Sequence, residues 1–429
     1  MPERATIFQK TQLGVETTPG TNVPATKILQ ATTIQPAIKA DVKTFRTMGS
    51  KFPSLAAEGK EWVEAKIEGQ GSYHDLTYLL ASLMCTPTPA QQGGTTAYKS
   101  TFVVANGLAD LVTTYSVEHG GSVRGHEFSY GLVNELGLDI SRDEVKVSGT
   151  MIGQRLTDDV YPSTNEIQTI GDSGVVSGGH CHFTFGGQTT GTVAWNADAA
   201  TVQAALEALS TIGTGGVRCT GGPLPGDVVV EFIGPLAQTN VALLTVDNTA
   251  ITGGGTIVVA ETLAGAAPTY IAYQPILPAE ISVYLAATAA GLPGSALTRV
   301  LKCSWKLGSR FGPIWVLDAS KTSWVVHVET EPDMTATILM EADAAGMALL
   351  TQLRSGASKF LRIEAVSAAL AGVAYPYTLT LDMCGKVSAV SEFSDADGVY
   401  AIEWTLKGAY DSTWGKACQV EVTSTLSAL

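Results

Sequence analysis

The sequence predicts a mainly β protein: two related β-sandwich or barrel-forming modules, each with a short flanking helix, and a small α+β domain inserted between them. Three observations support this prediction. Glycine is abundant, at 45 of 429 residues, and valine and threonine recur in short alternating runs, a composition that favours strands and turns. Apolar residues with helical spacing are confined to a few short stretches. Several local patterns occur twice in the same order, on either side of a stretch of different composition.

The repeated patterns begin with a Gly-Ser-x-Phe turn, at residues 49–52 and again at 308–311. An alternating strand is expected after each turn, at 61–69 and at 323–330, and a short helix after each strand. The first helix should begin at Ser72, and the second near Asp343. Their apolar stripes predict core packing for Leu76, Leu79, Leu80 and Leu83, and for Leu349, Leu350 and Leu353.

Further strands complete each half of the repeat. Strands are expected at 98–104 and 359–365, followed in each half by a pair of strands. Within those pairs Gly131-Leu132-Val133 matches Gly385-Lys386-Val387, and Gly153 matches Gly408. The predicted domains are therefore module 1 (1–165), an insert (166–268) and module 2 (269–429).

The insert has a composition of its own. Its only basic residue is Arg218, and it is rich in glycine and acidic residues. An alternating strand, His-Cys-His-Phe-Thr-Phe, precedes a helix that Asn196 or Asp198 should cap, with Val202, Leu206 and Leu209 on its apolar side. Strands follow, so a compact β-β-α-β domain that can fold alone is expected.

Charge and cysteine usage exclude several classes of function. The formal net charge of −14 argues against tight binding of nucleic acid or of an anionic membrane, since both need clustered lysine and arginine. The six cysteines are scattered without a C-x-x-C pair, so no zinc or redox site is expected, and the thiols should be reduced and mostly buried. The N-terminus lacks the apolar core of a signal peptide, and no run of 18 apolar residues occurs, so we expect assembly in a cytosol and no membrane span.

Two stretches carry a resemblance to a known family. One is ISRDEVKVSGTMIGQ (140–154), which follows TTYSVEHGG (113–121), and the other is VYAIEWTLKGAYDSTWGKACQVEVTST (399–425). Together with the repeat, they resemble the major tail tube proteins of bacteriophages with long, non-contractile tails (the siphovirus type). The resemblance covers both modules, and the insert is similar to small accessory modules of phage structural proteins.

The resemblance implies a structural virion protein and not an enzyme, without a cofactor or a metal. Members of this family form β-barrel rings that stack into a tube, which conducts DNA during ejection without binding it tightly. A fused duplication implies a ring of three chains with pseudo-sixfold symmetry, with a hexamer as the alternative. The implied partners are further copies of the chain, the tape measure protein and DNA in the lumen, and the tail terminator and tail tip proteins. The implied location is the virion tail, assembled in the host cytoplasm. The insert is expected to face outward because it lies between two complete repeats, and there it could touch a host surface weakly.

Few residues suggest chemistry. Gly171-Asp172-Ser173-Gly174 is similar to a protease nucleophile loop but lacks a matching histidine context, and is interpreted as a loop. His180 and His182 fall on one strand face without a third metal ligand nearby in sequence, and His327 is interpreted as a structural or interface residue. The residues of the two Gly-Ser-x-Phe turns are candidate inter-ring contacts, with a solvated hairpin tip as the equal alternative: Arg46, Lys51, Phe52, Arg310 and Phe311.

Three other interpretations remain open from the residues alone. The first is another virion component, such as a tail terminator or a capsid decoration protein, which would form single rings or particles. The second is a β-rich glycan-binding or adhesion protein, with the insert as binder, which a glycan array would detect. The third is a hydrolase, which rests only on Gly-Asp-Ser-Gly.

Overall fold

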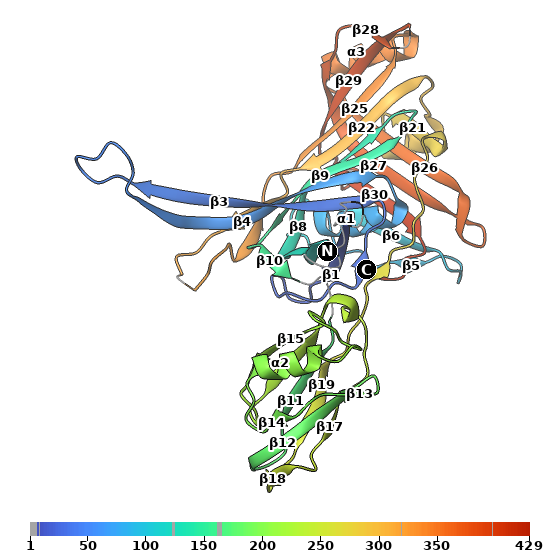
Figure 1. The fold of residues 1–429 in the computed structure, drawn as a ribbon. Helices are drawn as coiled ribbons and strands as arrows, with labels where there is room; N and C mark the ends of the chain where they lie inside the picture. Colours follow the sequence, from blue (N-terminus) through green and yellow to red (C-terminus); the bar gives the residue numbers. More distant parts are fainter. Residues whose placement is uncertain (1–6, 8, 122–124, 161–164, 319, 397) are drawn as a thin grey trace.

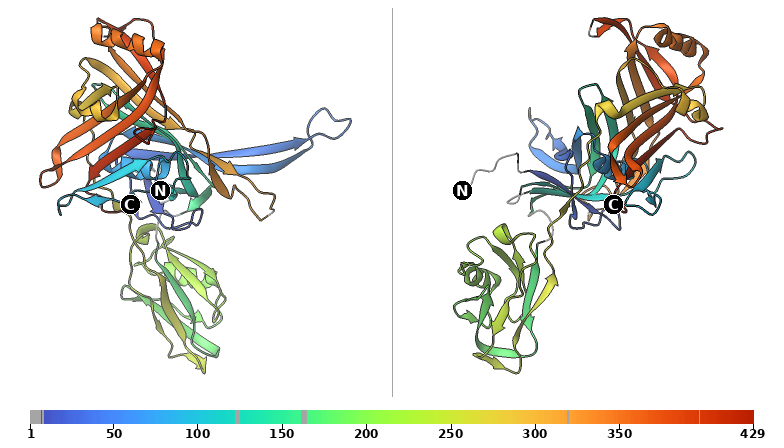
Figure 2. Two further views of the ribbon diagram at one scale, coloured as in Figure 1. Left: turned by 180° about the vertical axis from the view of Figure 1, so that it is seen from behind. Right: turned by 90° about the vertical axis from the view of Figure 1, so that its right-hand side faces the viewer.

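The protein is mainly β, as predicted. The computed structural model describes residue 7 and residues 9–121, 125–160, 165–318, 320–396 and 398–429. Strands dominate all three segments, and the helices are few and short. In Figure 1 the strands of the two modules form one connected body, the hairpin β3–β4 projects from it as a long arm, and the insert hangs below as a separate lobe. The side and rear views show the same arrangement (Figure 2).

Module 1 is built on one antiparallel sheet. Its strands pair in the order β3-β4-β9-β8-β7-β1. The elements of module 1 are β1 (Lys10–Val15), β2 (Lys27–Ile28), β3 (Thr32–Phe45), β4 (Leu55–Gln70), α1 (Tyr73–Leu83), β5 (Ala90–Gln91), β6 (Tyr98–Val103), β7 (Tyr115–Gly120), β8 (Gly125–Ile140), β9 (Val145–Gly153) and β10 (Thr157–Val160).

Module 2 repeats this strand order. Its strands pair as β22-β25-β29-β27-β26-β21, again antiparallel throughout. The elements of module 2 are β20 (Thr269–Tyr270), η3 (Pro278–Glu280), β21 (Ile281–Ala286), η4 (Ala289–Gly294), β22 (Val300–Gly308), β23 (Phe311–Ile314), β24 (Val326–Glu329), β25 (Asp333–Glu341), α3 (Ala344–Ser355), β26 (Ser358–Gly372), β27 (Tyr375–Val390), β28 (Ser394–Ala396), β29 (Val399–Gly408) and β30 (Cys418–Ser424). The six strands of each order therefore correspond one to one, β3 with β22 through β1 with β21.

Irregularities in the ladders fix this correspondence residue by residue. The β8–β9 ladder shifts register between Val133 and Glu135, and the β27–β29 ladder shifts between Val387 and Ala389. This places Leu132 opposite Ile152 in module 1 and Lys386 opposite Lys407 at the same positions in module 2. The matching glycines predicted from sequence therefore occupy equivalent positions in the two modules, and both are closely packed: a Cβ on Gly153 would strike the ring of Phe128, and one on Gly408 would strike Met334.

Two of the expected strand correspondences are wrong. The strand before the second helix is β25, and not residues 323–330, of which only 326–329 form a strand, β24. The strand β6 at 98–103 pairs with β30, whereas the strand that begins at 358, β26, corresponds to β7. Both errors arise because short alternating runs look alike in sequence, whereas hydrogen-bonded register distinguishes them.

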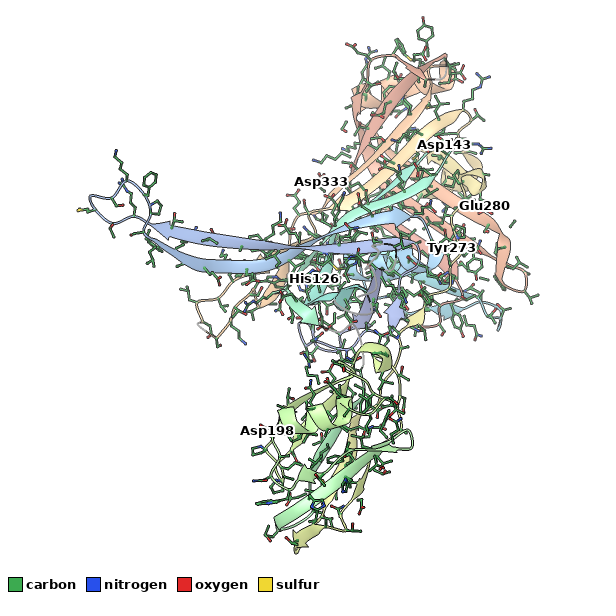
Figure 3. All side chains as sticks on the ribbon, in the orientation of Figure 1. His126, Asp143, Asp198, Tyr273, Glu280 and Asp333 are labelled. Carbon is green, nitrogen blue, oxygen red and sulfur yellow. The ribbon has the colours of Figure 1, made fainter. Side chains whose placement is uncertain are left out.

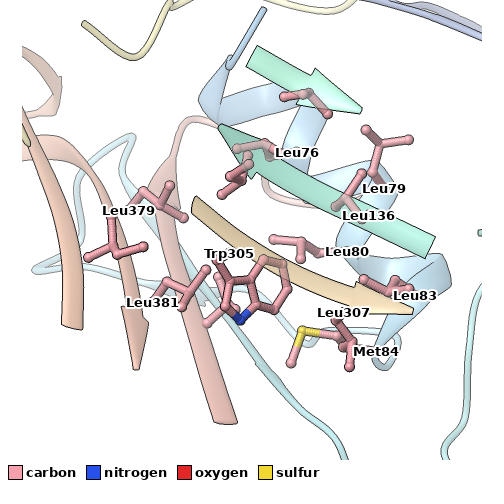
Figure 4. Close-up of a cluster of buried hydrophobic side chains, with 14 of the residues drawn as sticks. Leu76, Leu79, Leu80, Leu83, Met84, Leu136, Trp305, Leu307, Leu379 and Leu381 are labelled. Atoms are coloured by element: carbon pink, nitrogen blue, oxygen red, sulfur yellow. The ribbon is translucent and has the colours of Figure 1, made fainter. Parts of the chain in front are cut away.

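The helix α1 lies at the junction of the two modules. All eleven of its residues are buried, and it packs on β8 of module 1 as well as on β27 and β30 of module 2. Its leucines Leu76, Leu79, Leu80 and Leu83 face Trp305, Leu379 and Leu381 of module 2 in one shared core (Figure 4). Burying each such side chain contributes about 1.5–3 kcal/mol, so the two modules stabilise each other through this helix.

The helix α3 occupies the corresponding place in module 2 but is more exposed. Leu349 is buried, while Leu350 and Leu353 are half-buried against the same core. The amide of Met347 donates to the carbonyl of Asp343, as that of Leu76 does to Ser72, so the two helices begin at the same point of the repeat.

The insert has a core of its own that the described core of the modules does not share. A sheet in the order β15-β16-β11-β19 packs with α2 and with strands that pair on β12. Asp198, marked in Figure 3, caps α2 by accepting a hydrogen bond from the amide of Thr201 at 2.8 Å, one of the two caps expected. The elements of the insert are β11 (Ile167–Asp172), β12 (Val176–Phe185), β13 (Gln188–Thr189), β14 (Val193–Ala194), α2 (Ala199–Glu207), β15 (Val217–Gly221), β16 (Val228–Phe232), η2 (Gly234–Leu236), β17 (Thr245–Asp247), β18 (Ile251–Gly253) and β19 (Ile257–Leu263).

The two ends of the insert lie side by side. Its first strand, β11, pairs antiparallel with its last, β19, and Ile167 stands opposite Leu263. The chain therefore enters and leaves this lobe at neighbouring points, as inserted domains usually do.

Candidate assembly surfaces

The two modules are joined by a continuous strand pairing. Residues 303–307 of β22 pair antiparallel with residues 136–140 of β8, so Leu307 stands opposite Leu136 and Cys303 opposite Ile140. β22, which is the first strand in the order of the module 2 sheet, thereby continues the module 1 sheet by pairing with residues 136–140 of β8. The contact is directional, because one module offers β8 and the other offers its first strand.

A small hairpin reinforces this junction. The strands β23 and β24, between β22 and β25, fold down onto module 1. The amide of Phe311 donates to Oδ1 of Asn134 at 2.7 Å, and its ring is buried with Leu132 and Ile152. The indole of Trp324 is 1% exposed, and its Nε1 donates to the carbonyl of Gly153 at 2.9 Å. The hairpin thus covers the flank of module 1 beside β8 and β9.

Arg310 anchors the hairpin from within the core. Its guanidinium donates from Nη2 to Oδ2 of Asp110 at 2.7 Å and from Nε to the carbonyl of Leu83, at the end of α1, at 2.9 Å. Both side chains of the ion pair are almost fully buried. Burial raises the pKa of the Asp110 carboxyl, against the opposing effect of hydrogen bonds and of Arg310. The expectation that Arg310 and Phe311 lie at an exposed hairpin tip is therefore wrong, because the chain turns inward after Gly308.

The corresponding hairpin of module 1 is the arm. Its outer ladder pairs residues 42–45 with 55–58, as β23–β24 pairs residues 311–314 with 326–329. In both hairpins the ladder is interrupted at the same place: between Ala40 and Val42 in the arm, and after Gly308 in module 2. Val42 therefore corresponds to Phe311, and the Gly-Ser-x-Phe turns, which lie at the tip of the arm but at the base of the module 2 hairpin, do not correspond.

The arm is exposed along its outer half. Its side chains stand out from the ribbon with no other element beside them (Figure 3). Arg46, Lys51 and Phe52 lie in its tip, where Arg46 Nη1 donates to the carbonyl of Ser50 at 3.2 Å. The large exposed apolar residues of the arm are Ile38, Val42, Phe45, Met48, Phe52 and Leu55. Such a row on a strand edge is typical of a surface that pairs with another chain.

Module 2 carries the matching open edge. Val390, which corresponds to Leu136, pairs with Trp404 of β29, and among the described strands no partner lies on its other side. On the flank next to it, Lys386 and Lys407 are exposed where module 1 has the covered residues Leu132 and Ile152. Two edges of the described sheets thus remain open: that of β3 in module 1 and that of β27 at Val390 in module 2.

The residues singled out for catalysis or metal binding do not form such a site. Ser173 exchanges a hydrogen bond with the hydroxyl of Thr256 at 2.8 Å, and no described hydrogen bond joins it to a histidine. The rings of His180 and His182 lie 5.5 Å apart, but in the described part of the chain no group of three His, Cys, Asp or Glu side chains is placed to hold a metal ion. His327 contacts Phe311 and Tyr130 within the docked hairpin, so it is an interface residue between the two modules.

The remaining features of the described residues concern the whole chain. None of the helices that the structure describes has the length and apolar character required to cross a bilayer. All six cysteines are free thiols, and four of them are buried.

Sequence missed the docked hairpin and the anchor Arg310–Asp110. A signal was present in the cluster of aromatic residues between 311 and 324, which is unusual for a solvated turn. In comparisons with known proteins, no protein-family model matches the chain, and no curated protein is significantly similar to it.

Proposed function

We propose that this chain is a self-assembling structural protein that forms rings by head-to-tail strand pairing, and that the rings stack into the tail tube of a long-tailed bacteriophage. The observation that carries the proposal is the β8–β22 pairing. It joins module 1 to module 2. The corresponding edges, that of β3 in module 1 and that of β27 at Val390 in module 2, have no strand partner on their open sides among the described residues. The same contact between chains would place β3 of one copy on the open edge of module 2 of the next.

The register of this contact follows from the repeat. Leu307 pairs with Leu136 inside the chain, and the corresponding residues are Ile38 and Val390. Ile38 is 56% exposed and Val390 is half-buried, so pairing would remove apolar surface from water. A heterologous contact of this kind yields a ring when its rotation closes, and closure pairs both open edges.

The chain's chemistry suits a conduit for DNA. The net charge of −14 gives little phosphate anchoring, so DNA would pass without sticking. The tape measure protein would occupy the same lumen. Three chains, hence six modules, would make one ring, with the tail terminator and tail tip proteins at the ends of the tube. The insert, attached through one pair of neighbouring strands, would project outward.

Electron microscopy of the purified protein tests the proposal directly. Stacked rings with three chains and six similar modules are expected, and a persistent monomer, or six chains in one ring, would contradict it. Cross-linking tests the register: the pair Ile38→Cys and Val390→Cys should form a reducible link between chains. The matched control, Ile38→Cys with Ser391→Cys, should not, because adjacent strand residues point to opposite faces.

A further inference from the structure

The unoccupied flank of module 2 contrasts with the covered flank of module 1. On module 1, the hairpin β23–β24 of module 2 buries Leu132 and Ile152 beneath Phe311 and Trp324. On module 2, the corresponding Lys386 and Lys407 are exposed, and the weak ion pair of Lys407 with Asp333, at 3.9 Å, leaves both side chains more than half exposed. A cavity of about 660 Å³ opens beside Lys407, Gly408 and Tyr410. Residues 104–109 and 329–332 of the same chain line the other side of this cavity, while Lys386 and Lys407 themselves stay exposed.

We propose that the arm of a second copy of this chain occupies that flank, folded down at its ladder interruption as β23–β24 is folded onto module 1. The inference rests on the proposed head-to-tail assembly and names the second surface of the same contact. The strand pairing of β3 alone would leave the outer arm in solvent. An arm that is bent at its ladder interruption would bury its outer half against the flank.

Geometry supplies the first argument. The arm and β23–β24 share the same ladder, with Val42 in the place of Phe311. Both ladders break next to this position. Ser309 there adopts a φ of 55°, and in the arm Gly59 and Lys60 form a bulge opposite the single residue Asp41. The arm can therefore bend where its counterpart bends. Docked in that way, Val42 would lie over Lys386 and Lys407.

Charge complementarity supplies the second argument. Arg310 of the docked hairpin corresponds to Asp41 of the arm, so the anchoring charge is reversed. The receiving surface changes in step: the apolar Leu83, Leu132 and Ile152 of module 1 correspond to Arg354, Lys386 and Lys407 of module 2, all three exposed. Glu58, which corresponds to Glu329, adds a second acid to the arm. In the free chain Asp41 pairs with Lys43 at 3.0 Å and Lys407 pairs with Asp333 at 3.9 Å. Docking would exchange these exposed pairs for contacts of Asp41 and Glu58 with the three bases, which favours this flank for the arm.

The tip of the arm fits the cavity beside the flank. Val326 corresponds to Leu55 in the two ladders, so Trp324, two residues earlier, corresponds to Pro53, which follows the exposed Phe52. Trp324 donates to the carbonyl of Gly153, whose counterpart Gly408 lines the cavity. The Phe52 ring of the second copy would enter part of this cavity, although it would make no hydrogen bond of the kind that Trp324 makes.

Charge reversal on the full-length chain tests the inference. Asp41→Lys with Glu58→Lys, or Lys386→Glu with Lys407→Glu, should raise the protein concentration needed for ring formation roughly tenfold or more, since like charges would face each other. The chain that carries all four changes should assemble near the wild-type concentration. Loss without rescue, or no loss at all, would overturn the docking.

Cross-linking separates this inference from the proposed function. Under mild oxidation, Val42→Cys with Lys386→Cys should give reducible links between chains. Lys43→Cys with Lys386→Cys should not, because Lys43 points to the other face of the arm. Rings without the Val42 link would overturn the docking and leave the ring proposal standing. A wild-type chain that forms no rings would overturn both. Tryptophan fluorescence of the dissociated chain checks that each cysteine variant folds. Folding is expected because Val42, Lys43 and Lys386 are all exposed.

Discussion

The arm β3–β4 and the hairpin β23–β24 share one ladder, yet one projects into solvent and the other is docked. Their registers agree pair for pair, so backbone pairing does not decide between the two states. The two hairpins differ in the protein surface that lies next to each of them. The docked hairpin finds Asn134, Gly153 and Asp110 in the same chain, whereas the arm points away from its own flank. The docked copy is therefore held by its partner surface, and under the proposed assembly the projecting copy would be held by a further chain.

The largest effect should come from removing the anchor of the docked hairpin. Arg310→Ala leaves the Asp110 carboxylate buried without its cation and should lower the free energy of unfolding by about 3–5 kcal/mol. Asp41→Ala, at the corresponding position of the arm, should change the stability of the dissociated chain by less than about 0.5 kcal/mol. Denaturant titration measures both. Equal effects at the two positions would mean that the docked and free hairpins do not differ as described.

A smaller effect, visible as a pH dependence, is expected at the buried helix. The pKa of His74 in α1 is lowered to about 4 by burial, and its exposed fraction is zero. A histidine held neutral contributes stability that is complete above its unfolded pKa of about 6.5 and is lost as the pH falls toward 4. Between pH 7 and pH 5 the wild-type chain should lose about 1–2 kcal/mol more stability than His74→Gln. Parallel pH profiles of the two proteins would show that His74 is not the titrating group.

Removal of the insert should have a smaller effect still. Ile167 and Leu263 are neighbours across two strands, so a short Gly/Ser linker can replace residues 166–268 without stretching either module. We expect the stability of the modules to change by less than about 1 kcal/mol, because the two cores are separate, and ring formation to be retained. A folded deletion variant that forms no rings would place the insert in the assembly interface.

A mixing experiment affects assembly alone and sharpens the comparison of the two flanks. The arm-reversed chain (Asp41→Lys, Glu58→Lys) and the flank-reversed chain (Lys386→Glu, Lys407→Glu) should bind each other but not themselves. Strict alternation cannot close a ring of three, so the mixture should give open oligomers, as measured by mass photometry. Closed rings from the mixture would indicate an even number of chains.

The sequence was sufficient for the mainly β class, for the leucine stripes of α1 and for the matching glycines at 153 and 408. These patterns report local periodicity and close packing, which act within a few residues. It was insufficient for the place of Arg310, because a basic residue after Gly-Ser reads as solvated unless its distant partner Asp110 is known. The Gly-Ser-x-Phe match was misleading for a related reason: three identical residues of four suggest an equivalence that the register of the paired strands excludes.

The pairing of β22 with β8 inside one chain also bears on the thermodynamics of association. Every module-to-module contact made within a chain forms at the high effective concentration of linked partners and loses little translational or rotational entropy. In a ring of six modules, three of the six contacts would be formed before any two chains meet. Nucleation of a ring would then depend on the collision of three bodies in place of six. Because part of the contact between chains is charged, salt concentration would shift the point at which polymerisation begins.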